Sequence, residues 1–246
     1  ADNIFCMLIE RLLVWILIPF AAQAVPVLTG VHPLAVPPGR AVEITLQGAN
    51  FADDLRLWTS FGGPADFVKR IDAKHAVFRV TAPKGMALKV CALRVYDRTG
   101  ISELILMMVD SLPTTTAVST DKSNPIPLKL PVTVDGRMGG ANPHWFSIDA
   151  KAGQKISIEV YAERIASSAD PMLRLLGPEG REVGFADDDD VLGSDAGLVY
   201  RARASGRHLL ELRDVQFRGG GPFRLRVGGM PAKFVLKDAP GQVSEI

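Results

Sequence analysis

The sequence is poor in cysteine, which excludes disulfides as a source of stability. Only Cys6 and Cys91 occur in the 246 residues. Cys6 lies upstream of the apolar core of a predicted leader, so removal of the leader would leave Cys91 alone. A single cysteine cannot form an internal disulfide, and stability must come from hydrophobic cores. Cys91 lies in the apolar stretch LKVCALRVY and is predicted to be a buried, inert thiol.

The sequence also lacks an excess of charge of one sign. Its 28 Lys and Arg residues nearly balance its 27 Asp and Glu residues, for a net charge of +1. No long basic run occurs, and basic residues do not alternate with aromatic ones, so nucleic acid is excluded as a predicted partner. Helical periodicity is nearly absent, and only AERIASSAD could hold a turn of helix. Abundant Gly and Pro instead indicate short strands and tight turns.

No catalytic motif is present. The chain has no Gly-x-Ser-x-Gly, no P-loop and no Gly-x-Gly-x-x-Gly opening a helix. The four histidines lack zinc-ligand spacing: His32, His75, His144 and His208. Gly219–Gly221 lies between two predicted strands and is predicted to be a hairpin turn. A pair of acids that cleaves glycosides is not excluded, but only the abundance of carboxylates supports it. The sequence therefore predicts a protein that is not an enzyme.

Residues 1–24 predict a secretory signal peptide. From Met7 the chain reads MLIERLLVWILIPFAAQA, which is a charged start, an apolar run and a small-x-small end. Met7 is predicted to be the true start, with residues 1–6 as upstream read-through, and cleavage is expected after Ala24. The apolar run is shorter than the ~20 residues of a transmembrane helix. An uncleaved membrane anchor is the alternative. We expect a secreted protein, whether periplasmic, surface-bound or extracellular, with no membrane span after cleavage.

Residues 25–112 predict a β-sandwich. The stretch AVEITLQG alternates apolar and polar residues, which is the period-two pattern of a half-buried strand. Further strand patterns follow, separated by turns rich in Gly, Pro and Asp. About seven short strands with turns every 8–12 residues favour two packed antiparallel sheets.

This part resembles an IPT/TIG immunoglobulin-like domain. The resemblance covers roughly residues 25–110 and is carried by VPVLTGVHPLAVPPGRAVEITLQGANF, VTAPKG and YDRTGIS. It implies an immunoglobulin-like sandwich that acts as a spacer or interaction module, with no chemistry of its own.

Residues 113–129 predict a linker, and residues 130–229 predict a second β-domain. PTTTAVSTDKSNPIPLK is rich in Thr and Pro, which indicates an extended joint between domains. Strand patterns then restart at Leu130, with AGQKISIEVYAE, GRHLLELRD and PFRLRVG among the clearest. Residues 230–246 form a tail.

The second part resembles the bacterial pre-peptidase C-terminal (PPC) domain, a jelly-roll-like sandwich. The resemblance is carried in order by HWFSI, AGQ, ISIEV, SADP before MLRLLGPEG, the acidic loop, HLLELRD and the triple glycine with FRLRV. His208 departs from the family, because an aromatic residue usually lies there. The series of leader, immunoglobulin-like domain and PPC-like domain resembles the N-terminal part of exported planctomycete-type proteins.

The stretch FADDDDVLGSD is the strongest concentration of charge in the chain. Its four aspartates are Asp187, Asp188, Asp189 and Asp190. Adjacent carboxylates repel one another, which solvent, arginines or a cation must offset. Resemblance to calcium-binding relatives of the PPC domain implies a calcium site, to which Asp214 could add a ligand, while a solvated acidic loop is the alternative. Asp214 could instead cap the glycine-rich turn. Asp170 is expected to be a turn former, with a role as a metal ligand as the alternative.

Together these features predict an all-β protein of two sandwich domains in tandem that works as a non-catalytic accessory or binding segment. The expected partner is an extracellular protein or a polysaccharide, and calcium is the one cofactor considered. The alternative function is a fragment of an exported peptidase or other hydrolase whose catalytic domain lies outside this chain.

Overall fold

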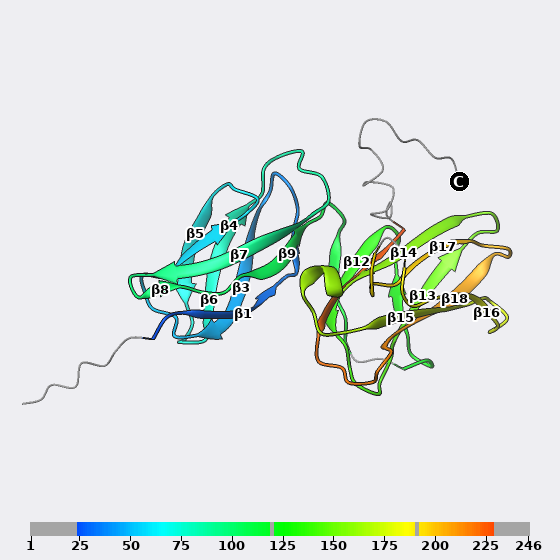
Figure 1. Ribbon diagram of the computed structural model, residues 1–246. Coiled ribbons are helices and arrows are strands. Elements are labelled where there is room, and N and C mark those ends of the chain that lie inside the picture. The colour runs from blue at the N-terminus through cyan, green and yellow to red at the C-terminus, as the bar shows by residue number, and fades with distance from the viewer. Residues whose placement is uncertain (1–23, 119–120, 190–191, 229–246) are drawn as a thin grey trace, which may run out of the picture.

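A computed structural model describes residues 24–118, 121–189 and 192–228 (Figure 1). Nearly all of its regular structure is β-strand, which confirms the predicted fold class. The one helical element of the described residues is the 3-10 turn η1 (Glu163–Ile165), at the place where the sequence allowed a turn of helix. No helix in the described part is long and apolar enough to cross a membrane. The predicted leader (1–24, except Ala24), Asp190 and the tail lie outside the described residues.

The first sandwich packs a four-stranded sheet against a sheet centred on its longest strand, β7. The first sheet has the order β1 (Val27–His32), β3 (Ala41–Ala49), β6 (His75–Thr81), β5 (Ala65–Arg70). The second has the order β2 (Ala35–Val36), β9 (Ile105–Val109), β7 (Lys89–Asp97), β4 (Arg56–Thr59), and β8 (Gly100–Ile101) pairs with β7.

Alternation along the strands builds the first core. On β3, Ile44 and Leu46 point inward and are fully buried, and on β7 the inward residues are Cys91, Leu93 and Val95. Burial raises the pKa of the Cys91 thiol, which keeps it protonated and unreactive. The prediction of a buried, inert cysteine is therefore confirmed.

The second sandwich consists of two five-stranded sheets. One has the order β10 (Thr114–Thr116), β12 (Val132–Arg137), β19 (Pro222–Val227), β14 (Lys155–Tyr161), β17 (Gly197–Arg201). The other has the order β11 (Ile126–Leu128), β13 (His144–Ala150), β18 (Gly206–Asp214), β15 (Pro171–Leu176), β16 (Glu182–Ala186).

Two sequence-based expectations are wrong in this half. The predicted linker contributes β10 and β11, which pair in parallel with β12 and β13 as edge strands, so much of it belongs to the second sandwich. Gly219–Gly221 is not a hairpin turn, because β18 and β19 lie in different sheets. It carries the chain from one sheet to the other.

His208 is buried in the second core, as a packed histidine. Its ring is 0% exposed and lies 5.7 Å from the Tyr200 ring. Nδ1 donates to the carbonyl of Gly206 at 3.1 Å, whereas Nε2 is buried and has no partner among the described residues. A buried acceptor without a donor lowers stability.

We expect His208→Phe to raise the free energy of unfolding by about 1 kcal/mol, because it removes the unpaired nitrogen and keeps an aromatic ring in place. Urea unfolding of both proteins measures the change. The control is His75→Phe, at a surface histidine paired with Asp72, which should bring no gain. A loss of stability in His208→Phe would show that Nε2 has a role that the packing does not reveal.

A buried ion network joins the two sandwiches, which lie side by side in Figure 1. Arg224 on β19 contacts Asp110, just after β9, at 3.2 Å and Asp135 on β12 at 2.5 Å. Arg226, two residues along, contacts the same Asp110 at 3.0 Å and Glu159 on β14 at 3.5 Å. Because Asp110 belongs to the first sandwich, both arginines connect the domains.

Further contacts lock this junction. Asp135 Oδ2 accepts the backbone N–H of Leu34 from the first domain at 2.8 Å. Tyr161 and Ile165 of the second domain pack into the core cluster of the first, and η1 contacts β9. Charged groups buried in this way require partners, and here each has one. The domains therefore form one continuous structure around this junction.

Candidate binding site

A cleft of about 840 Å³ opens between the two domains. Its first-domain wall comes from β1, from Gln47 on β3 and from residues 104–106 around the start of β9. Its second-domain wall comes from residues 116–118, 135–137, 139, 142–144, 165–168 and 220–222. Leu34 and Asp135, which form the backbone-to-carboxylate bond between the domains, both line the cleft. The cleft is thus built by the same contacts that hold the domains together.

Neutral hydrogen-bonding groups dominate the polar lining. They come from both walls and comprise Thr29, His32, Gln47, Thr116, Asn142, His144, Ser167 and Ser168. Of the charged groups, Asp135 is paired with Arg224, and Arg137 donates to the carbonyl of Gly220. His144 Nε2 donates to the carbonyl of Arg137 at 2.8 Å, and its ring packs between Phe146 and Phe223. The cleft therefore offers many neutral donors and acceptors.

Glycine lets backbone form part of the cleft wall. A Cβ on Gly221 would lie 2.3 Å from Ser167 Oγ and 2.7 Å from the backbone nitrogen of Ala169. Only glycine allows the segment between β18 and β19 to approach the loop after η1 so closely. Packing at the cleft thus explains Gly221, whereas Gly220 has open space around it and a positive φ of 88°.

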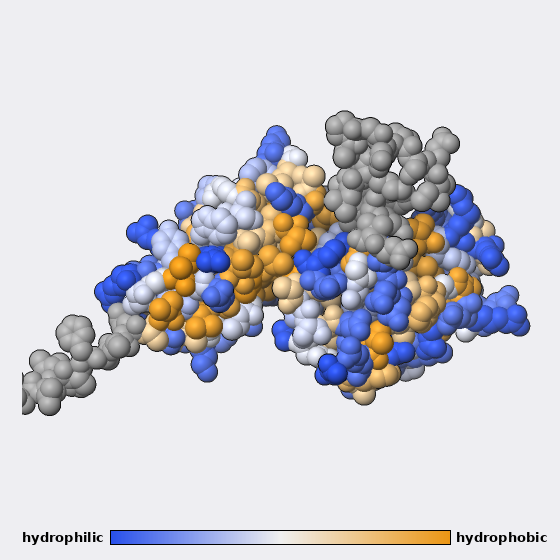
Figure 2. Space-filling view, in the orientation of Figure 1, coloured by the Kyte–Doolittle hydropathy of each residue, from blue (hydrophilic) through white to orange (hydrophobic). Residues whose placement is uncertain are grey.

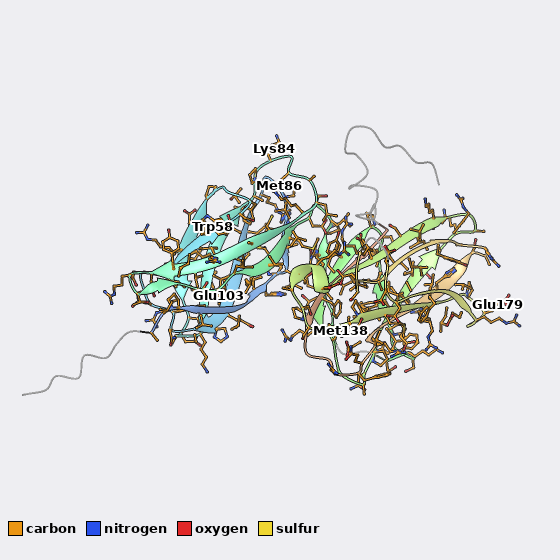
Figure 3. All side chains as sticks on the ribbon, viewed as in Figure 1. Trp58, Lys84, Met86, Glu103, Met138 and Glu179 are labelled. Carbon is orange, nitrogen blue, oxygen red and sulfur yellow. The ribbon has the colours of Figure 1, made fainter. Side chains whose placement is uncertain are left out.

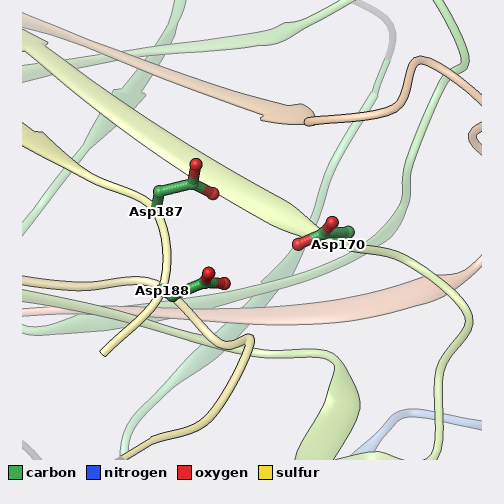
Figure 4. A group of neighbouring side chains, drawn as sticks. All are labelled: Asp170, Asp187 and Asp188. Carbon is green, nitrogen blue, oxygen red and sulfur yellow. The ribbon is translucent and has the colours of Figure 1, made fainter. Parts of the chain in front are cut away.

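The acidic loop forms a second cluster of functional groups. The carboxylates of Asp187 and Asp188 converge with that of Asp170, and their ligand oxygens lie within 4.8 Å of one another (Figure 4). Asp170 was expected to form a turn, with a metal role as the alternative, and its Oδ2 also accepts from Gln216 Nε2 at 3.3 Å. Asp189 faces its own turn, where Oδ1 accepts the N–H of Leu192 at 3.3 Å. The loop thus gathers two of its aspartates with one from the start of β15.

Asp214 is not part of this cluster. Its Oδ1 accepts the N–H of Asp170 at 2.9 Å, and its Oδ2 accepts the N–H groups of Arg218 and Gly219 at 2.7 and 3.3 Å. Burial opposes ionisation of this carboxyl, but these three backbone bonds outweigh it and lower the pKa of Asp214. Of the two roles weighed for it, Asp214 caps the glycine-rich segment.

The three clustered carboxylates suit a hard cation in their chemistry. Calcium takes 6–8 oxygen ligands, and three aspartates offer up to about six. Desolvation and the charges of Asp188 and Asp170 raise the pKa of Asp187, so the cluster is electrostatically unfavourable when it stands alone. Calcium at this cluster stays a prediction.

Substitution of Asp187 by asparagine tests that prediction. Because the folded pKa of Asp187 lies above its ordinary 3.8, its ionisation destabilises the folded state, and stability falls as pH rises through the folded pKa. Without calcium, Asp187→Asn should remove this fall and be more stable near neutral pH by on the order of 0.5 kcal/mol. Thermal melting over a pH series measures it.

Calcium should make the wild type more stable than Asp187→Asn. Calcium at 100 times its dissociation constant would stabilise the wild type by about 2.7 kcal/mol and Asp187→Asn by less. Equal melting shifts in the two proteins, or none in either, would rule out calcium at this cluster. Glu179→Asn, in an exposed turn of the same domain, is the control for general salt effects.

Sequence reasoning missed Asp195, the most connected aspartate of the stretch. Its carboxylate is 0% exposed and accepts the N–H groups of Ala162, Glu163 and Arg164 and the guanidinium of Arg164. It thereby fixes the start of η1, which docks on the first domain. The signal in the sequence was a lone acid in a Gly-Ser-Asp turn, which is also a common surface pattern.

Among the described residues, neither His75 nor Cys91 belongs to a nucleophile–base pair. Among them, His75 contacts only Asp72, on the surface, and the buried thiol of Cys91 lies near a carbonyl and not near a histidine. Within residues 24–118, 121–189 and 192–228, the one group of three potential metal ligands is the aspartate cluster. The cleft itself has the character of a binding site.

No protein-family model and no curated protein matches the chain. Among solved structures, a pre-peptidase C-terminal domain of collagenase from Bacillus anthracis is 15% identical with a TM-score of 0.35, covering 48% of this chain and 99% of that one. SGBP-B from a complex xyloglucan utilization locus in Bacteroides uniformis is 10% identical with a TM-score of 0.26, covering 84% and 73%.

The Yersinia pseudotuberculosis adhesin InvE is 11% identical with a TM-score of 0.29, covering 84% of this chain and 57% of that one. The first of the three structures belongs to the PPC family that residues 130–229 resemble. The IPT/TIG and planctomycete-type resemblances stay predictions. All three TM-scores are below 0.5.

Proposed function

We propose that this protein is an exported, non-catalytic binding protein that holds a polysaccharide in the cleft between its two sandwiches. The observation that carries the proposal is the cleft of about 840 Å³, lined on both walls by neutral hydrogen-bonding groups. A volume of this size lies within the range of ligand sites, which occur preferentially at domain interfaces. Export is supported by the leader pattern of residues 7–24.

A polyhydroxylated ligand suits the chemistry of the lining. Each sugar hydroxyl both donates and accepts, and amides, hydroxyls and imidazoles do the same. Gln47 from the first domain and Asn142 from the second are both exposed and line opposite walls. Neither side chain takes part in the buried ion network. The two side chains are thus positioned to contact one ligand from both sides.

The test is a binding measurement on a panel of neutral polysaccharides by affinity gel electrophoresis and calorimetry. Gln47→Ala and Asn142→Ala should each weaken binding by about tenfold, with unchanged melting curves. Glu179→Ala is the control, because Glu179 lies at the far end of the second domain (Figure 3). Failure of the wild type to bind any member of the panel, or equal binding by all variants, would refute the proposal.

A further inference from the structure

A flat, exposed face of the first domain carries two aromatic and two basic residues. On β4, Arg56 and Trp58 point outward between the buried Leu57 and Thr59. On β7, Arg94 and Tyr96 point outward from the same sheet. Trp58 pairs with Arg94 and Arg56 with Tyr96 across the two strands. We call these four residues the aromatic–arginine face.

Register places the four side chains in a square. Residues directly opposite one another have Cβ atoms about 5 Å apart, and diagonal neighbours about 7–8 Å apart. The two rings therefore lie on one diagonal and the two guanidinium groups on the other. Each ring has an arginine as its direct neighbour across the strands.

The face is exposed and its cations have no carboxylate partners. Trp58 is 48% exposed and Tyr96 is 38% exposed. No ion pair among the described residues includes Arg56 or Arg94. The outward positions of β4 and β7 hold no acidic residue. An aromatic surface with two unpaired guanidinium groups is complementary to an anionic partner.

This face continues the surface that the second domain covers. Leu106 on β9 is the register partner of Ala92 on β7, lines the cleft, and belongs to the strand that η1 contacts. Moving from β9 across β7 to β4 therefore leads from the junction to Trp58. Figure 2 shows apolar residues gathered on the visible side of the first domain between β8 and the second domain, and Figure 3 places Trp58 over this sheet.

We propose that the aromatic–arginine face binds a polysaccharide that carries carboxylates, such as a chain of uronic acids. One face of a pyranose ring presents C–H groups that pack on an aromatic ring. A uronate adds a carboxylate at the edge of the same sugar, where an arginine fork can hold it with two hydrogen bonds. The square of alternating rings and guanidinium groups matches both features in adjacent sugars.

A linear glycan fits this surface better than a protein partner does. A stable protein interface needs about 800 Å² and 20–30 residues on each side, with pockets for its anchors. The outward positions of β4 and β7 are few, and none of the four side chains lines the cleft between the domains. A polysaccharide chain needs only a narrow strip.

Calorimetry with polygalacturonate and with its fully methyl-esterified form tests the proposal on the wild-type chain. Binding of polygalacturonate should weaken by about tenfold or more on esterification, and likewise in Trp58→Ala and in Arg94→Gln. Trp58→Phe should retain most of the affinity, because it keeps a ring. Binding should also weaken with added salt, since the attraction is partly ionic.

Two controls make the outcome decisive. Phe185→Ala removes an equally exposed aromatic residue from the second domain, 53% exposed, and should bind like the wild type. Asn142→Ala in the cleft should also leave polygalacturonate binding unchanged, so the face and the cleft proposal can fail separately. No binding, equal affinity for the esterified chain, or an equal loss in Trp58→Ala and Phe185→Ala would overturn the proposal. All five variants alter exposed or half-buried side chains, and unchanged melting curves verify their folding.

Discussion

Replacing Arg224 with methionine is expected to lower the free energy of unfolding by about 3–5 kcal/mol. Arg224 is 0% exposed and holds Asp110 and Asp135, and it also donates to Thr114 Oγ1 at 3.1 Å. Methionine fills much of the same volume but leaves Asp135 buried without its cation. The large cost arises from that unpaired carboxylate and not from the lost arginine alone.

Urea unfolding measures the effect, and a double variant separates its causes. Arg224→Met combined with Asp135→Asn removes both charges of the pair, so it should be more stable than Arg224→Met alone. Arg203→Met, at an exposed arginine, should change stability by no more than about 0.5 kcal/mol. If the double variant were as unstable as the sum of its two single changes, the pair would not be coupled, and the network would not explain the junction.

This network shows what alternation in a sequence does and does not reveal. VTVDG, ISIEVY and FRLRV alternate apolar with polar residues, and their apolar positions do form the second core. The polar positions, including Asp135, Glu159 and Arg224, predict a solvated face. They are buried, because the first domain covers that face. The two-residue period of a strand shows which residues share a side of the sheet. What covers that side depends on contacts between residues about 100 positions apart in the chain.

The predicted linker was wrong for a related reason. A Thr- and Pro-rich segment looks extended and open in sequence, and β10 and β11 are indeed short and extended. They pair in parallel with strands that follow them by about 20 residues. Such pairing depends on where the neighbouring strands lie. Parallel strands are not joined by a tight turn, so no local turn sequence predicts the pairing. Proline is also tolerated there, because both are edge strands of their sheets.

The acidic stretch was predicted from its charge, whereas its structural importance lies elsewhere. Four adjacent aspartates stood out, and two of them converge with Asp170, for which a turn was the favoured role and a metal ligand the alternative. Asp195, at the end of the same stretch, holds three backbone N–H groups and one arginine. A buried carboxylate that binds backbone has no sequence pattern that separates it from a solvated one.

Asp195→Ala is therefore expected to lower the free energy of unfolding by about 3–5 kcal/mol. The change leaves the N–H groups of Ala162 and Glu163 without their acceptor and removes one of the two carboxylates that hold Arg164. It also frees the turn that carries Ile165 into the first core. Urea unfolding measures the loss, and limited proteolysis of the folded protein should detect new cleavage around residues 162–168.

Two matched variants determine whether position or charge matters in this stretch. Asp195→Asn keeps an oxygen that can accept from the backbone, so it should lose less stability than Asp195→Ala. Asp188→Ala removes an equal charge from an exposed site in the same loop and should cost no more than about 0.5 kcal/mol. An Asp188→Ala protein as unstable as Asp195→Ala would contradict this account. The run of aspartates, and not the buried Asp195 after it, would then stabilise the loop.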